Sequence, residues 1–386
     1  MKHNINHLKR LQSFRRELHR NPELAFHEYQ TAQRVKQLIT EANPTKIIDK
    51  IGGTGMAFFF ESGKPGPVIA IRSELDALPI EEINDFDYIS SVDNISHKCG
   101  HDGHMTMVSG LAEMLRENPP EKGTVILLFQ PAEETGEGAL QMINDEKMKD
   151  IKPDYMFGLH NLPGKPAGQI LSREGIFASA SIGIIIRLKG KTSHAAEPEN
   201  GLSPAIAMAQ NVEMLSNLVT EVKDELNDFS LITVIHARLG EQAFGTTPGY
   251  AEVMGTIRSY QNEDLETLKS KATGKAKKIA HNHGLNVEID WTEEFSSTEN
   301  HPDCYAVVKQ AAQNNNFDFK EMDEPYRWSE DFGYFTQKYK GAMFALGSGV
   351  NTPDLHNPDY DFPEKLIPYG LNMFMEIITL TLENQR

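Results

Sequence analysis

The sequence is poor in cysteine and has no long apolar run. Its 386 residues include two cysteines, Cys99 and Cys304, which is too few for a disulfide-stabilised scaffold. Cys99 lies among several histidines, so we expect a reduced thiol and a cytoplasmic location. No stretch approaches the roughly 18 uninterrupted apolar residues of a transmembrane helix. The charged segment 1–20 does not resemble a secretory signal.

Positive charge is also scarce. Lys and Arg total 38 against 55 for Asp and Glu, so the formal net charge is −17. Because phosphate contacts depend on Lys and Arg, this balance argues against nucleic acid or an anionic membrane as the partner. It does not exclude a small substrate, since a local cationic site can lie within an acidic surface.

Several common catalytic motifs are missing. There is no G-x-S-x-G sequence, and Gly347-Ser348-Gly349 does not supply one. The GKT at 190–192 lacks the upstream glycine of a phosphate-binding loop, and no H-E-x-x-H helix is present. A serine hydrolase, a nucleotide enzyme and a metalloprotease of that helical type are therefore disfavoured.

Hydrophobic periodicity predicts an α/β fold. The first 42 residues read as two helices separated at Pro22. Four short apolar segments follow, at 55–61, 67–79, 124–134 and 155–161. Helical segments are expected at 104–117 and 138–147. Continuous apolar strands that alternate with helices are typical of a mostly parallel sheet buried on both faces.

A second organisation is expected between about 180 and 292. Its strands and helices follow the order β-α-β-β-α-β, which is a self-contained ferredoxin-like unit. The α/β pattern then resumes with a helix near 303–315, a strand in MFALGSG and a helix at 364–383. We therefore predict a discontinuous first domain, 1–178 and 293–386, with an inserted domain at 179–292.

One histidine-rich run suggests a metal site. In SHKCGHDGHM, Cys99 and His101 are one residue apart and are flanked by His97 and His104. Thiolate and imidazole are preferred ligands of Zn²⁺ and neighbouring transition metals. The alternative is an inert thiol beside surface histidines, which would be the usual interpretation of any one of these residues alone.

Further acids and imidazoles follow predicted strands. Glu133 and Glu134 come directly after TVILLFQ, where acids also suit a helix dipole. His160 ends YMFGLH, the segment 67–79 carries acids at its end, and His356 lies in a Pro-flanked loop. In open α/β sheets, catalytic and ligand-binding residues lie at the ends of the strands. A metal pair could activate water, and a carboxylate outside the ligand set could move its proton.

At these motifs the sequence resembles the aminoacylase/carboxypeptidase family of dinuclear metallohydrolases, in the branch of hippurate hydrolases and indole-acetyl-amino-acid amidohydrolases. The matching segments follow the family order along nearly the whole chain: RSELDALP, CGHDGH, PAEE, GLH, GKTSHAAEP, SEDFGYF and LHNPDYDF. The resemblance implies a zinc-peptidase-like catalytic domain and an inserted domain that acts as lid and dimerisation domain.

The resemblance also implies roles for individual residues. The implied metal ligands, for two divalent ions (Zn, Mn, Ni or Co), are Cys99, His101, Glu134, His160 and His356. Glu133 is the implied general acid/base, and Asp76 matches the acid that orients the metal site. His194 matches the lid histidine that stabilises the tetrahedral oxyanion. Many relatives supply it across a dimer, so a homodimer through the inserted domain is expected.

The sequence departs from the family mostly in the inserted domain. Glu199 replaces a frequent His, and AFGTTPG lacks an Asn that relatives carry. Glu74 stands where relatives usually have Asp. Arg258 either binds a substrate carboxylate or forms an interdomain ion pair, and the sequence favours neither. The expected activity is hydrolysis of an N-acyl amino acid. Hydrolysis of small peptides and a non-catalytic binding protein are the alternatives.

Overall fold

The computed structural model describes residues 5–383, which form two compact units. Unit 1 comprises Met1–Phe177, Thr298–Pro325 and Asp331–Arg386, and unit 2 comprises Ala178–Ser297 and Tyr326–Glu330. The short segment 326–330 joins unit 2 because Ser179 hydrogen-bonds the carbonyl of Tyr326 through both its backbone N–H, at 3.0 Å, and its hydroxyl, at 2.8 Å. Hydrophobic periodicity carries no signal for such a pairing.

Unit 1 is built on an eight-stranded sheet with the order β1-β2-β4-β3-β5-β16-β6-β15. Its strands are β1 (Lys46–Ile51), β2 (Gly55–Glu61), β3 (Val68–Glu74), β4 (Thr124–Gln130), β5 (Tyr155–Pro163), β6 (Ile170–Ser172), β15 (Phe319–Glu321) and β16 (Lys340–Gly349). The central pairs β4–β3, β3–β5 and β5–β16 are parallel, while β1–β2 and β2–β4 are antiparallel. The predicted mostly parallel sheet is confirmed.

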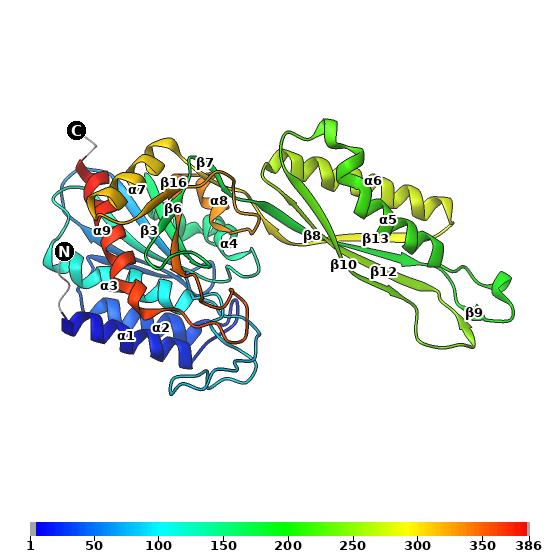
Figure 1. The fold of residues 1–386 in the computed structure, drawn as a ribbon, viewed down its shortest axis with the longest axis horizontal. Helices are drawn as coiled ribbons and strands as arrows, with labels where there is room; N and C mark the ends of the chain where they lie inside the picture. The colour runs from blue at the N-terminus through cyan, green and yellow to red at the C-terminus, as the bar shows by residue number, and fades with distance from the viewer. Residues whose placement is uncertain (1–4, 384–386) are drawn as a thin grey trace. The chain divides into compact units, whose positions relative to one another are not determined.

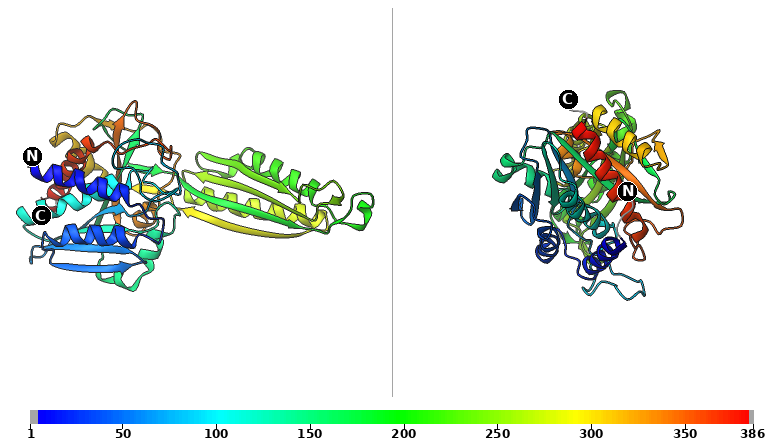
Figure 2. Two further views of the ribbon diagram at one scale, coloured as in Figure 1. Left: turned by 90° about the horizontal axis from the view of Figure 1, so that it is seen from below. Right: turned by 90° about the vertical axis from the view of Figure 1, so that its left-hand side faces the viewer.

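Helices pack against this sheet around one apolar core. They are α1 (Ile5–Arg20), α2 (Tyr29–Thr40), α3 (His101–Glu117), α4 (Gly138–Asn144), α7 (Pro302–Asn314), α8 (Phe332–Thr336) and α9 (Ile367–Glu383). Helices α1, α3 and α9 pack together (Figures 1 and 2), because each buries an apolar face that includes Leu11, Leu111 or Phe374. Helix α3 begins three residues before the predicted start at 104, so His101 lies in its first turn.

The remaining elements are short helical turns and one pair of short strands. They are the 3₁₀ helices η1 (Glu146–Asp150), η2 (Pro198–Asn200), η3 (Lys223–Glu225) and η4 (Glu364–Leu366), and the paired strands β7 (Gly175–Ala178) and β14 (Thr298–Asn300). The helix predicted at 138–147 therefore ends at Asn144 and is followed by η1. In the part of the chain that the structure describes, no helix has the length and apolar character needed to cross a membrane.

Unit 2 contains the predicted β-α-β-β-α-β order. Its elements are β8 (Ala180–Lys189), α5 (Ala205–Glu221), β10 (Ser230–Leu239), β12 (Tyr250–Ser259), α6 (Asn262–Asn282) and β13 (Asn286–Phe295). The four strands form an antiparallel sheet in the order β10-β12-β8-β13, and α5 and α6 cover one face of it (Figure 1). Ile184, Leu215 and Leu268 are fully buried between these layers. A separate hairpin pairs β9 (Ser193–His194) with β11 (Thr246–Thr247).

Candidate active site

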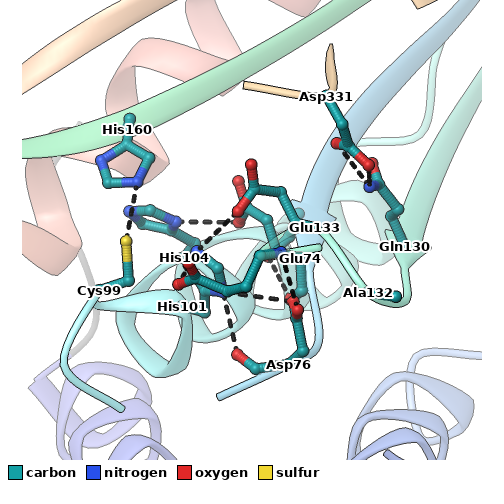
Figure 3. Close-up of polar contacts among 12 residues, drawn as sticks. Glu74, Asp76, Cys99, His101, His104, Gln130, Ala132, Glu133, His160 and Asp331 are labelled. Atoms are coloured by element: carbon teal, nitrogen blue, oxygen red, sulfur yellow. Dashed lines mark hydrogen bonds and ion pairs between the residues drawn. The ribbon is translucent and has the colours of Figure 1, made fainter. Parts of the chain in front are cut away.

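The candidate site lies where the parallel strands of unit 1 end. Strand β3 ends at Glu74 and leads to Asp76, β4 leads to Glu133, and His160 lies near the end of β5. Because β4, β3 and β5 run parallel, their carboxyl ends meet at one edge of the sheet. The first turn of α3 brings His101 to the same place (Figure 3).

The structure brings all five predicted metal ligands and Glu133 together. Cys99 Sγ lies 3.3 Å from His160 Nε2. His101 Nε2 lies 3.8 Å from a carboxylate oxygen of Glu133 and 3.8 Å from one of Glu134. His356 Nε2 lies 3.6 Å from the other oxygen of Glu134. Three overlapping groups each keep their ligand atoms within 4.8 Å of one another: Cys99, His101 and His160; Cys99, Glu134 and His356; His101, Glu133 and Glu134.

Two buried atoms in this cluster fit a metal ion. His101 Nε2 and Glu134 Oε1 are inaccessible to solvent and have no hydrogen-bond partner among the described residues. A buried polar atom left unpaired costs about 1–3 kcal/mol, yet these two face each other across 3.8 Å. A cation between them would satisfy both. The donor set of thiolate, imidazole and carboxylate suits Zn²⁺ and related transition metals better than Mg²⁺ or Ca²⁺.

The electrostatics of the cluster are consistent with bound cations. Burial lowers the pKa of His101, but a hydrogen bond to Asp76 and the charges of Glu74 and Glu134 raise it to about 10. Burial raises the pKa of Glu134 to about 7. Burial holds the pKa of His160 well below its usual range, which keeps the imidazole neutral and able to bind a metal. The carboxylates of the site therefore give it a negative potential, which attracts cations.

Asp76 contacts two of the predicted ligands. Its backbone carbonyl accepts a hydrogen bond from His101 Nδ1 at 2.9 Å, which leaves Nε2 as the metal-facing nitrogen. One oxygen of its carboxylate accepts the backbone N–H of Glu134 at 3.0 Å. Asp76 therefore fixes both the ring of His101 and the backbone of Glu134, a geometry that suits the orienting role expected for it.

The loop that carries Cys99 is held by Asn161, which was not predicted. Asn161 Nδ2 donates to the Cys99 carbonyl at 2.8 Å, and Tyr360 donates its buried hydroxyl to Asn161 Oδ1. Gly100, between Cys99 and His101, has a φ of 91°. A Cβ at Gly100 would lie 2.4 Å from Asn161 Oδ1, so the approach requires glycine. No local sequence pattern indicates these contacts, because they depend on the folded path of the chain.

His356 reaches the cluster through a backbone contact. Its N–H donates to the carbonyl of Lys98 at 2.8 Å, next to Cys99 in the chain. The Lys98 ammonium is buried and donates to Glu82 at 2.6 Å and to the carbonyl of Tyr360 at 2.8 Å. These contacts bring the distant loop of His356 to the Cys99 loop.

Glu74, the departure from the family, lies behind the ligands. Its carboxylate receives hydrogen bonds from the buried Arg72 and, at 2.9 Å, from His104 Nδ1. Burial raises the pKa of Glu74, but the positive charge of Arg72 and the hydrogen bond from His104 outweigh it and hold that pKa well below its usual range. Arg72 also donates to Asp331 at 2.9 Å. His104 therefore turns toward Glu74 (Figure 3), and Arg72 and Asp331 are supporting residues that the sequence did not reveal.

The two remaining predicted residues lie in unit 2. His194, on β9, is exposed, and its Nδ1 accepts the backbone N–H of Ala196 at 3.1 Å. The neutral ring then carries its proton on Nε2. Arg258, on β12, donates through Nη1 to the Arg327 carbonyl and the Ser329 hydroxyl, both at 3.0 Å. Both acceptors are uncharged and lie in unit 2, so the two alternatives for Arg258, a substrate carboxylate and an interdomain ion pair, both stay predictions.

Comparisons with known proteins identify the family of this chain. Residues 70–380 match the model of peptidase family M20/M25/M40. The chain is 30% identical over 376 residues to N-acetylcysteine deacetylase of Bacillus subtilis, covering 97% of each chain. It is 32% identical over 388 residues to IAA-amino acid hydrolase ILR1-like 5 of Arabidopsis thaliana, covering 95% of this chain and 85% of the relative.

A solved structure supports the same assignment. The YXEP protein of Bacillus subtilis, described as a dinuclear metal-binding peptidase of the M20 family, aligns with a TM-score of 0.83 and 28% identity. The alignment covers 98% of this chain and 99% of that one. The protein is a metallo-amidohydrolase, and its chain belongs to peptidase family M20/M25/M40.

Proposed function

We propose that this protein hydrolyses the amide bond of N-acyl amino acids and releases a carboxylic acid and an amino acid. Two divalent metal ions, chosen from Zn²⁺, Mn²⁺, Ni²⁺ and Co²⁺, are held by Cys99, His101, Glu134, His160 and His356. The observation that carries the proposal is a pair of buried atoms without a hydrogen bond, His101 Nε2 and Glu134 Oε1, with the carboxylate of Glu133 3.8 Å from the same nitrogen.

The neighbouring glutamates divide the chemistry. When bound, a pair of metal ions lowers the pKa of water to about 7 and polarises a carbonyl. Glu133 is 4% exposed, so its carboxylate lies in a site that excludes most water. It takes the proton from the attacking water at one carboxylate oxygen and delivers it to the leaving nitrogen. Glu134 stays a ligand, because its backbone is fixed by Asp76.

His194 supplies the oxyanion donor in this proposal. Since Nδ1 accepts the Ala196 N–H, the ring presents Nε2–H as a donor. A donor held in place before the reaction can stabilise the charge that develops on the carbonyl oxygen. The hairpin of β9 and β11 restricts this ring, because Ser193 donates its N–H to the Thr247 hydroxyl at 2.8 Å.

Arg258 is the residue we assign to the carboxylate of the amino acid. Its guanidinium is half-buried, and burial lowers its pKa because no acid among the described residues compensates the charge. Two neutral acceptors fix Nη1 and leave the rest of the planar group for a bidentate contact. The named activities of the two relatives, on N-acetylcysteine and on IAA-amino acids, involve substrates with such a carboxylate.

Unit 2 also supports a homodimer. Strand β10 is an edge strand whose Leu231 and Ile235 are 38% and 62% exposed. The opposite edge, β13, carries acids such as Glu288 and Asp290 that discourage pairing. A second copy that pairs along β10 would cover the apolar edge. Because the protein has few cysteines, we assign it to the cytoplasm. Because its surface is acidic, we expect its partner to be a small molecule.

The test combines substrates, metal and one substitution. Protein freed of metal by a chelator is reloaded with Zn²⁺, Mn²⁺, Ni²⁺ or Co²⁺ and assayed on N-acetyl, N-benzoyl and indole-acetyl amino acids and on dipeptides. We expect turnover of the acyl amino acids that needs metal. Glu133→Gln should retain the metal and lose activity by about 10²–10⁴-fold.

The matched control is Glu137→Gln, three residues beyond Glu134 and exposed, which should behave as the wild type. An activity indifferent to chelation contradicts the metal proposal. Turnover of dipeptides alone would favour a peptidase, and full metal loading without turnover of any substrate would favour a binding protein.

A further inference from the structure

Glu28 is a buried carboxylate that no motif of the site includes. It lies just before α2 and is 0% exposed. One oxygen, Oε1, accepts the backbone N–H of Phe26 at 2.9 Å and that of Ala132 at 2.8 Å. The other, Oε2, accepts the hydroxyl of Thr54 at 2.8 Å. Three segments far apart in the sequence thus meet at one side chain.

The two backbone groups that share Oε1 belong to strained residues. Phe26 has a φ of 61° and Ala132 a φ of 49°, and neither is glycine. A left-handed conformation costs a residue with a side chain roughly 1–2 kcal/mol. Such a conformation persists only when its surroundings impose it. The carboxylate of Glu28 supplies that restraint for both.

Ala132 begins the turn that carries both functional glutamates. Ala132 lies two residues after the end of β4, Glu133 and Glu134 follow it directly in the chain, and Figure 3 labels Ala132 and Glu133. At the other end of the turn, the N–H of Glu134 is held by Asp76 at 3.0 Å. The turn is therefore clamped between two carboxylates, with Glu28 at its start and Asp76 at its end.

The carboxylate of Glu28 does not cap α2, the helix that follows it. It makes no side-chain capping bond to α2. That helix is capped by Glu23, which accepts the N–H of Thr31 at 2.7 Å and that of Gln30 at 3.2 Å. Burial, with the nearby charge of Asp76, raises the pKa of Glu28 to about 7, so the fold keeps this acid at an energetic cost.

From these contacts we propose that Glu28 is a positioning residue, which holds Ala132 in its left-handed conformation and thereby aims Glu133 and Glu134 at the metal site. The inference rests on the proposed function, in which Glu133 is the base and Glu134 a ligand. A displacement of about 1 Å at a catalytic group can cost about 10²-fold in rate. Supporting residues of metal ligands typically contribute about 10–100-fold in metal affinity.

Two variants of similar size separate positioning from stability. In Glu28→Gln the amide oxygen still accepts both N–H groups and the amide nitrogen donates to the Thr54 hydroxyl, so kcat should stay within about threefold of the wild type. In Glu28→Met the N–H of Ala132 loses its acceptor. We expect kcat to fall by about 10²-fold with little change in KM, and Zn²⁺ affinity, measured by titration of the metal-free protein, to fall by about 10–100-fold.

Glu23→Met is the control, because it uncaps the same helix without touching the turn. It should lower the melting temperature and leave kcat and Zn²⁺ affinity unchanged below that temperature. A folded Glu28→Met enzyme with wild-type kcat and Zn²⁺ affinity overturns the proposal, as does a loss in Glu28→Gln as large as that in Glu28→Met.

If Glu28→Met does not fold, Glu28→Asp provides the measurement, since its carboxylate is one methylene too short to hold Ala132. It should lose at least tenfold in kcat, and a folded variant without that loss refutes the role. Glu133→Gln, assayed in parallel, separates the test of the catalytic base from the test of the positioning role of Glu28. Activity retained in Glu133→Gln contradicts the assigned base, whereas only the Glu28 series bears on positioning.

Discussion

Replacing Tyr360 by Phe tests whether the loop of Cys99 is held as the structure indicates. The substitution removes one buried hydroxyl and keeps the ring, so no cavity larger than an oxygen atom forms. Asn161 Oδ1 then loses the donor that satisfies it, while Asn161 Nδ2 keeps its 2.8 Å bond to the Cys99 carbonyl. Tyr360 is 0% exposed, so water does not replace the lost donor.

The size of the effect follows from the unpaired acceptor. Leaving a buried acceptor unsatisfied costs about 1–3 kcal/mol. At about 1.4 kcal/mol for each tenfold change, that range corresponds to roughly 5- to 150-fold in an equilibrium constant. We expect a part of it to appear as weaker Zn²⁺ binding, because Asn161 also packs against Gly100 between the ligands Cys99 and His101. The remainder should appear as a lower melting temperature.

The assay is competition for Zn²⁺ with a chromophoric chelator, together with thermal unfolding of the metal-free form. The control is Tyr250→Phe in unit 2, which loses a hydroxyl bonded to Glu252 at 3.0 Å and should leave Zn²⁺ affinity unchanged. If Tyr360→Phe binds Zn²⁺ within twofold of the wild type, the Asn161 contact does not position the ligand loop. The reasoning would then be refuted even if stability fell.

Three further predictions concern other parts of the molecule. Gly100→Ala should abolish Zn²⁺ binding, because the added methyl meets Asn161 at 2.4 Å and φ is 91°; Gly274→Ala, where nothing lies within 4 Å, should be tolerated, and equal metal contents in the two would contradict the close approach. Arg258→Met should raise KM by about 10–100-fold for acyl amino acids, because it removes one charged hydrogen-bonded contact of about 1.5–3 kcal/mol. KM should not change for substrates whose carboxylate is blocked as an amide. An equal change for both kinds of substrate would show that Arg258 does not bind the substrate carboxylate. Because the pKa of Glu28 is raised from 4.5 to about 7, the folded state binds its proton more tightly, so this group's contribution to stability is present below about pH 4.5 and lost as pH rises through 7. Glu28→Gln should therefore be more stable than the wild type at pH 8, by on the order of 3 kcal/mol, and about equal at pH 4.5, as measured by urea unfolding; a difference independent of pH would show that Glu28 does not titrate in this range.

The parts of the fold that the sequence predicted are those whose hydrophobic pattern is long and regular. The apolar runs of β3 and β4 are buried along nearly their whole length, and the β-α-β-β-α-β order of unit 2 is present as expected. Strand β1 was missed because KIIDKI is half-exposed and charged, so it lacks both a continuous apolar run and a clear alternation. The start of α3 was placed too late because His101 and Asp102 look like loop residues until Gly100 is known to have a positive φ.

The residues of the candidate site also differ in whether the sequence could predict them. Residue types with a strong chemical preference, such as Cys99 and His101, could be found from spacing, and the structure groups them with the other predicted ligands. Glu28 and Asn161 could not be found, because they act by bonding backbone groups of distant segments. Which backbone N–H lacks a partner depends on the folded path of the chain, and no local pattern records it.

The carboxylates around the site also set its charge balance. Asp76, Glu133 and Glu134 lie together near the ends of the central strands, and the buried cation behind them, Arg72, is already bonded to Glu74 and Asp331. Such a group of carboxylates is costly to bury without compensating charge. Two divalent cations would provide that charge, and the same carboxylates then fix the backbone that presents the ligands. The negative field that attracts the metals and the hydrogen bonds that shape their site therefore come from one set of side chains, so a substitution in that set changes both metal affinity and geometry.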